Sequence, residues 1–144
     1  YETKDKKFIS IGSIEPQFYA ILLEKAGIED PDFDDQMNRE KWPLLKIKIE
    51  DIFKTKTRDE WCNLMEGTDV CFSPVLSIHE APKHQHNIDR ETFVEIDGVI
   101  QPNVAPRFSR TESKINGPSV MNGEHNEIAL VDWGINEEKI KSIF

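Results

Sequence analysis

Apolar residues in the first part of the chain follow two spacings, one after the other. Residues 7–12 largely alternate between apolar and polar, which is the spacing of a strand with one buried face. From residue 16 to residue 26 the apolar positions recur at helical spacing, and they are Phe18, Ile21, Leu22 and Ala26. Pro16 suits the first position of a helix and Gly27 suits its C-terminal cap. The pattern therefore predicts a strand that leads into a helix.

A second helix is predicted over residues 39–54. Its apolar residues lie on one stripe at helical spacing, and they are Trp42, Leu45, Ile49, Ile52 and Phe53. The intervening residues 29–40 are acidic and contain Pro31, so a loop is expected there. Lys46 and Lys48 are expected to form a solvated face of this helix, and a phosphate-binding patch is the alternative.

Two short segments have the pattern of a capping box, in which a hydroxyl and a carboxylate satisfy the first free backbone donors of a helix. The first is Thr57–Glu60, and it predicts a short helix that ends before Gly67. This helix is expected to bury Trp61, Leu64 and Met65. The second is Ser77–Glu80, and it predicts a helix of one or two turns that Pro82 closes.

Strand patterns return after the capped helix. Residues 70–75 are predicted to form a strand, with Pro74 near its end. Residues 93–96 and 99–100 flank Asp97-Gly98. This dipeptide readily takes the two positive φ angles of a type I′ turn, so a hairpin is predicted.

The character of the chain changes after Gln101. Three prolines with Asn, Ser and Gly between them indicate an extended stretch. Two helical pieces follow, over residues 124–133 and 136–144. The predicted fold class is therefore α/β, a small mixed sheet with several short helices, then an extended linker and a C-terminal helical tail. We place the boundary between the small α/β domain, 1–103, and the linker with its tail, 104–144.

Composition limits the partners of the chain. Its 144 residues are enough for a core, and 38% hydrophobic and 31% charged residues are typical of a soluble globular protein. The net charge of −9 argues against a nucleic-acid partner, because phosphate binding needs a cationic face. No apolar run approaches the length of a membrane span, so no membrane partner is expected. We expect a cytoplasmic location, with peroxisomes or mitochondria as the alternatives if the source is eukaryotic.

The cysteines and histidines do not form a recognisable metal or redox motif. Cys62 and Cys71 lie in apolar settings without CxxC spacing, so reduced, buried thiols are expected, and a disulfide is the alternative. The group of His79, His84 and His86 lacks the ordered spacing of zinc ligands. We therefore expect no metal. His125 is expected to be exposed or to cap the last helix.

Glu15 is the candidate for chemistry. This carboxylate lies directly before Pro16, where the strand gives way to the helix. The positive end of the helix dipole favours its ionised form, and regular elements hold it more firmly than a loop would. Two interpretations stay open at this point, a favourable acid at an ordinary helix start and an orienting group in a catalytic site.

A series of motifs carries a resemblance to a known family. The first is Gly12-Ser-Ile-Glu-Pro-Gln-Phe-Tyr19, and the others follow in the same order as in the family. They are Arg58–Cys62, Glu66–Val75, Glu80–Pro82, Asp97–Pro102, Ala105–Arg110 and Gly123–His125. Together they resemble the α-methylacyl-CoA racemases of the family III CoA-transferase superfamily, over nearly the whole chain. The match is to the C-terminal portion of that family, so we expect a fragment of a two-domain α/β enzyme that lacks the large CoA-binding domain.

The resemblance implies racemisation at the carbon beside a CoA thioester, with 2-methylacyl-CoA as the substrate. A His and an Asp of the large domain transfer the protons, and the carboxylate equivalent to Glu15 orients the His. Gly12, Ile14 and Tyr19 are implied to contact the substrate. No cofactor is implied, since CoA is part of the substrate. Interlocked homodimers are implied, in which the small domain of one chain covers the site of the other and the tail returns to the large domain.

Two alternatives to the racemase interpretation remain. The chain could be the small domain of a family III CoA-transferase, although those enzymes more often show Asn-Asp-x-Gln where this chain has Ile14-Glu-Pro-Gln17. It could also be a non-catalytic module that locks a dimer.

Overall fold

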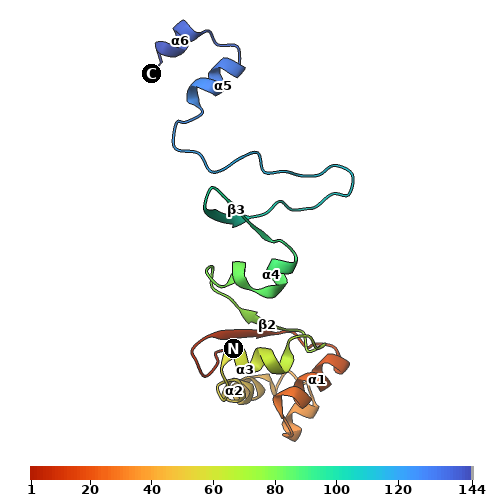
Figure 1. The fold of residues 1–144 in the computed structure, drawn as a ribbon. Helices are drawn as coiled ribbons and strands as arrows, with labels where there is room; N and C mark the ends of the chain where they lie inside the picture. Colours follow the sequence, from red (N-terminus) through yellow and green to blue (C-terminus); the bar gives the residue numbers. More distant parts are fainter. Residues whose placement is uncertain (144) are drawn as a thin grey trace. The chain divides into compact units, whose positions relative to one another are not determined.

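The computed structural model describes residues 1–143, and it divides the chain into two compact units, Tyr1–His79 and the residues from Glu80 onward. The first unit contains a two-stranded ribbon and three α-helices (Figure 1). Its elements in chain order are β1 (Phe8–Ile11), α1 (Pro16–Ala26), η1 (Pro31–Asp34), α2 (Trp42–Phe53), α3 (Arg58–Met65) and β2 (Phe72–Val75).

Strands β1 and β2 pair antiparallel, with Phe8 opposite Val75 and Ile11 opposite Phe72. The predicted strand 70–75 is thus confirmed over its last four residues. Cys71, directly before β2, has a positive φ of 56°, which is not a strand conformation. Pro74 lies within β2, opposite Ile9, and it is tolerated because β2 is an edge strand, whose outer side pairs with no other strand within residues 1–143.

Helices α1, α2 and α3 lie on the same side of this ribbon and enclose the core with it (Figure 1). Phe53 and Trp61 are fully buried, and the indole N–H of Trp61 donates a hydrogen bond to the Phe53 carbonyl at 2.9 Å. The two rings meet edge to face with their centroids 5.1 Å apart, a favoured aromatic geometry. The remaining buried members of the core are Ile9, Leu22, Phe33, Leu45, Ile49, Met65 and Val70.

The helix ends follow from local rules. Helix α1 covers the predicted residues, and Gly27 takes the left-handed conformation at its C-terminal cap, with φ of 67°. Helix α2 begins at Trp42 and not at residue 39 as predicted. The reason is Pro43, which has no N–H to donate and whose ring would clash with the carbonyl four residues earlier in a helix. A proline is therefore accepted only in the first turn.

Helix α3 has the predicted capping box. The Thr57 hydroxyl accepts from the Glu60 N–H, and the Glu60 carboxylate accepts from the Thr57 N–H. Trp61 and Met65 are buried as predicted, but the expected burial of Leu64 is wrong, since this side chain is 39% exposed. A helix of eight residues packs one narrow face inward, and positions four apart share that face while position 64 falls beside it.

The acidic loop contains an element that the sequence pattern did not predict. Residues Pro31–Asp34 form the 3₁₀ helix η1, and the Asp30 carboxylate accepts from the Asp32 N–H at its start. The Lys48 ammonium pairs with both Asp30 and Asp32, a contact that the prediction of a solvated face did not include, and its side chain stays 31% exposed. The hydrogen bond from Lys48 lowers the pKa of Asp30, and the two carboxylates raise the pKa of Lys48. Lys46 is exposed.

The second unit contains short elements in series. They are η2 (Ala81–Lys83), α4 (Gln85–Asp89), β3 (Phe93–Ile96), β4 (Val99–Pro102), α5 (Asn126–Asp132) and α6 (Glu137–Lys141). Strands β3 and β4 form the predicted hairpin, and Asp97 and Gly98 have φ angles of 51° and 77°. Both angles are positive, as a type I′ turn requires.

The predicted capped helix at Ser77–Glu80 is wrong in its position. The 3₁₀ turn η2 begins at Ala81, and Glu80 occupies the N-cap position without a side-chain capping bond. Pro82 lies in the first turn and does not close the element, because the missing N–H costs nothing there. Helix α4 then follows after His84.

The tail forms two short helices, close to the two predicted pieces. The Asn136 side chain caps α6 by accepting from the Lys139 N–H at 2.9 Å. Ile140 is buried, whereas Trp133 is 87% exposed. The final residue of the predicted segment, Phe144, lies outside the described residues. The boundary placed at residue 103 stays a prediction.

The α/β class is confirmed, and the strands have a simpler arrangement than expected. Residues 1–143 contain two separate two-stranded antiparallel sheets, β1–β2 and β3–β4, where one small mixed sheet was expected. Within this described part of the chain, no helix is both long and apolar enough to cross a membrane.

Candidate active site at the start of helix α1

Glu15 occupies the N-cap position of α1, immediately after the segment that leaves β1. Its backbone is extended, with φ of −69° and ψ of 143°, and its carbonyl accepts the first helical hydrogen bond from the Tyr19 N–H at 2.9 Å. The side chain is exposed and makes no capping bond. Within residues 1–143 no hydrogen-bond or ion-pair partner of the Glu15 carboxylate is found. The acid is therefore directed outward at the positive end of a helix dipole.

The three residues before Glu15 are tied to the segment that leads into β2. The Gly12 N–H donates to the Cys71 carbonyl at 2.9 Å, which extends the strand pairing by one residue. The buried Ser13 hydroxyl donates to the Val70 carbonyl. The turn that carries Glu15 is thus anchored to the core on this side.

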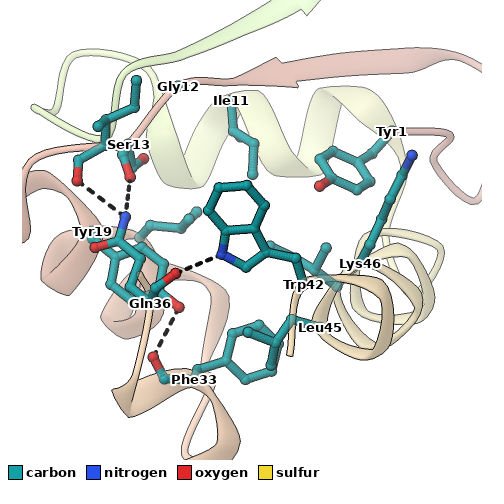
Figure 2. A pocket seen from close by; sticks show the side chains of 13 residues that line it. Tyr1, Ile11, Gly12, Ser13, Tyr19, Phe33, Gln36, Trp42, Leu45 and Lys46 are labelled. Carbon is teal, nitrogen blue, oxygen red and sulfur yellow. Dashed lines mark hydrogen bonds between the residues drawn. The ribbon is translucent and has the colours of Figure 1, made fainter. Parts of the chain in front are cut away.

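A second anchor comes from the loop after η1. The side-chain amide of Gln36 donates to the Ser13 carbonyl at 3.0 Å and to the Ile14 carbonyl at 3.1 Å. The indole N–H of Trp42 donates to the Gln36 carbonyl at 2.8 Å. Figure 2 shows these contacts around the same turn. Gln36 lies in the segment predicted only as an acidic loop, and nothing in the local pattern marked it.

An apolar cavity of about 370 Å³ lies beside this turn (Figure 2). All three residues predicted to contact a substrate, Gly12, Ile14 and Tyr19, line it, while Glu15 does not. Its other lining residues are Tyr1, Ile11, Ser13, Leu22, Phe33, Gln36, Trp42, Leu45, Lys46 and Ile49. Apolar and aromatic side chains dominate this set, so the cavity suits a hydrocarbon group.

Tyr19 presents its ring to the cavity while its hydroxyl is already engaged. The hydroxyl donates to the Phe33 carbonyl at 3.0 Å. Burial, and then the nearby Asp34 carboxylate, raise the pKa of the Tyr19 phenol above its ordinary value. A neutral phenol that serves as a donor to the backbone is a wall of the cavity, and it is not available as an acid or base.

The cysteines have unlike surroundings. Both are free thiols, and Cys62 is partly buried as part of α3. The expectation of burial is wrong for Cys71, which is exposed. The turn that carries Cys71 leaves the core between Val70 and β2, so the core residues do not enclose the Cys71 side chain.

We expect a thiol reagent to label Cys71 well before Cys62. Burial raises the pKa of the Cys62 thiol to about 11, which leaves about one part in a thousand as thiolate at pH 8. The measurement is mass spectrometry of the native 144-residue chain treated with iodoacetamide at pH 8, where one equivalent should add rapidly at Cys71. In Cys71→Ser this fast addition should disappear. Fast addition at Cys62 in that variant would contradict the expectation.

The histidines do not converge. His79 and His86 are exposed, His84 takes the N-cap position of α4, and His125 is exposed at the N-cap of α5 without capping it. In residues 1–143 no group of three or more His, Cys, Asp or Glu side chains is placed to hold a metal ion.

Comparisons with known proteins give a family from the sequence and a similar fold among solved structures. Residues 1–126 match the sequence profile of CoA-transferase family III. The chain is 43% identical to the α-methylacyl-CoA racemase of Mus musculus and 37% identical to that of Homo sapiens, in each case over 97% of this chain and 37% of the relative. A crystal structure of Rv3272 from M. tuberculosis has a similar fold, with a TM-score of 0.65 and 18% identity over 89% of this chain and 37% of that one. The chain thus spans little more than a third of these relatives.

Proposed function

This chain belongs to CoA-transferase family III, and we propose that it is the part of an α-methylacyl-CoA racemase that supplies a positioning carboxylate, Glu15. The observation that carries the proposal is the exposed Glu15 carboxylate at the start of α1, held on an anchored turn beside an apolar cavity. The identity to two proteins named as α-methylacyl-CoA racemases supports this branch of the family.

The proposed reaction inverts the carbon next to the thioester carbonyl of a 2-methylacyl-CoA. One base removes the α-proton, and the electron pair of the broken C–H bond moves into the thioester carbonyl to form an enolate-like intermediate. A conjugate acid on the opposite face then returns a proton to the same carbon. The reaction needs no oxidant and no cofactor, because CoA is carried by the substrate.

In this proposal the two proton-transfer groups, a His and an Asp, come from a large domain outside this chain. Glu15 accepts a hydrogen bond from the imidazole and thereby sets its tautomer and orientation. Its negative charge also stabilises the imidazolium, which raises the basicity of the ring. A carboxylate that has no internal partner in residues 1–143 is available for this role.

We further propose that the acyl chain contacts Gly12, Ile14 and the ring of Tyr19. These residues line the apolar cavity next to Glu15, so a hydrocarbon chain could be enclosed while the reacting carbon stays near the imidazole. The proposed assembly is an interlocked homodimer, in which Glu15 of one chain completes the site of the other. The C-terminal helical tail, with its exposed Trp133, would return to the large domain.

A CoA-transferase is the second candidate, and a proton-exchange experiment separates the two. The full-length protein is incubated with one enantiomer of a 2-methylacyl-CoA in deuterated water, with a free carboxylic acid present as acceptor. If the protein is a racemase, the substrate should lose its stereochemical purity and gain one deuterium at the α-carbon. Transfer of CoA to the acceptor acid without α-deuteration would replace the racemase proposal with the transferase.

The same assay on the 144-residue chain tests where the bases are. We expect no α-deuteration above the rate in buffer, because the proposal places both bases outside the chain. This result would leave the isolated chain as a docking and positioning module. Exchange above background would mean that the chain carries its own base, and the proposed division of roles would be wrong.

A further inference from the structure

We infer that Gln36 is a positioning residue that sets the direction of the Glu15 side chain. The inference rests on the proposed function, since it assigns Gln36 a role through Glu15. It concerns a residue for which neither the motifs nor the helix pattern indicated a task.

The geometry places one side-chain amide across two consecutive peptide carbonyls. The Gln36 amide nitrogen lies 3.0 Å from the Ser13 carbonyl oxygen and 3.1 Å from that of Ile14. The Ile14 carbonyl belongs to the same planar peptide unit as the nitrogen and Cα of Glu15. Fixing this oxygen therefore fixes the plane from which the Glu15 side chain departs.

Gln36 is itself held at its backbone. The indole N–H of Trp42 donates to the Gln36 carbonyl at 2.8 Å, and Trp42 is the first residue of α2. Just before this loop, the carbonyl of Phe33 in η1 accepts from the Tyr19 hydroxyl of α1 at 3.0 Å. Both sides of the loop are thus attached to helices, as Figure 2 shows. A glutamine on a restrained backbone is a firmer support than one on a free loop.

The hydrogen bonds that would be lost with the Gln36 amide distinguish a positioning role from a purely structural one. Ser13 keeps its own hydrogen bond to Val70 without Gln36. The bond from Gln36 to Ile14 is exposed, so water can replace that donor. The bond to the Ser13 carbonyl is partly buried, and its loss is expected to cost about 1 kcal/mol of folding free energy. What water cannot replace is the fixed direction of the peptide plane before Glu15. The loss should therefore appear in catalysis more than in stability.

The test uses Gln36→Met in the full-length protein, which keeps the length of the side chain and removes both N–H donors. We expect kcat for racemisation to fall about tenfold, since misplacement of a catalytic group by about 1 Å costs up to about 100-fold. KM should stay within about twofold of the unaltered protein. In the direction where the imidazole is the base, the acidic limb of the kcat–pH profile should move to lower pH, because a poorly placed carboxylate raises the imidazole pKa less.

The matched control is Asn38→Ala in the same loop. The Asn38 amide donates to the Asp35 carboxylate at 3.0 Å and has no bond to the Glu15 turn. We expect its kcat and pH profile to match those of the unaltered protein. If Gln36→Met fails to fold, Trp42→Phe serves as the second variant. It keeps an aromatic ring and removes the N–H that holds the Gln36 carbonyl. Because the restraint on Gln36 is weaker, we expect kcat to fall about threefold.

A double-mutant cycle with Glu15→Gln decides whether Gln36 acts through Glu15. If it does, the tenfold effect of Gln36→Met should shrink to below about twofold in the Glu15→Gln background. An equal effect in both backgrounds would overturn the inference and leave the proposed function standing. If Glu15→Gln alone leaves kcat unchanged, the proposed role of Glu15 fails, and the inference fails with it.

Discussion

Glu15→Gln in the full-length protein is expected to lower kcat for racemisation by about 100-fold, while KM stays within about threefold of its value in the unaltered protein. The amide keeps the shape and one acceptor oxygen but removes the charge that stabilises an imidazolium. Loss of a residue that orients a reactive imidazole typically costs 10-fold to 100-fold or more. The measurement is the initial rate of racemisation with each enantiomer of a 2-methylacyl-CoA.

The pH profile gives a second readout of the same substitution. A neighbouring carboxylate raises the pKa of a histidine, and its removal lets that pKa fall. In the direction where the imidazole acts as the base, the acidic limb of kcat should therefore move to lower pH. The fold should survive, because Glu15 makes no capping bond and the loss of its interaction with the helix dipole costs at most about 1 kcal/mol.

Glu29→Gln is the matched control, since Glu29 is another exposed carboxylate but lies beyond the far end of α1. It should leave kcat and the pH profile as they are. Unchanged turnover in Glu15→Gln would return Glu15 to an ordinary acid at a helix start. An equal fall in both variants would point to net charge as the cause, and it would also contradict the proposed role.

Trp61→Ala is expected to destabilise the first unit by about 3–5 kcal/mol, as for other buried aromatic residues cut back to alanine. Trp61 is fully buried, and its removal leaves a large hole next to Phe53 in the middle of the core. The Phe53 carbonyl also loses its indole donor, and an unsatisfied buried acceptor adds to the cost. Since domains of this size are stable by about 5–15 kcal/mol, the loss is a large fraction of the total.

The measurement is urea unfolding of the 144-residue chain followed by far-ultraviolet circular dichroism. Trp133→Ala is the control, because this tryptophan is 87% exposed, and its midpoint should match that of the unaltered chain. The urea midpoint of Trp61→Phe should lie between those of Trp61→Ala and Trp133→Ala, since phenylalanine keeps a ring but lacks the N–H. A loss below about 1 kcal/mol in Trp61→Ala would contradict this account of the core.

Several features of the fold could be predicted from residues close together in the chain. Pro16 and Gly27 mark the two ends of α1, Thr57 and Glu60 cap α3, and Asp97-Gly98 makes the hairpin turn. Each of these signals acts within about four residues, through a fixed φ angle, a missing N–H or a side chain that reaches the nearest free donor. Such effects do not depend on what packs against the element.

The departures from prediction arise where distant segments meet. Lys48 pairs with Asp30 and Asp32, eighteen and sixteen residues away, and Leu64 is exposed because the core accepts only one face of α3. The strands form two separate ribbons because each finds a single partner within residues 1–143. Hydrophobic pattern identifies which residues favour burial, but the packing partners decide which of them are covered.

The candidate site likewise combines features set by neighbouring residues with contacts between distant segments. An acid before Pro16, between a strand and the helix that starts there, could be predicted from neighbouring residues alone. The contacts that hold this acid in place come from segments that meet only in the folded chain. Gln36 reaches the Ser13 and Ile14 carbonyls from 23 and 22 residues away, through a loop whose course depends on Trp42 and Tyr19. A hydrogen bond between distant segments exists only once both are packed, and no local pattern encodes it.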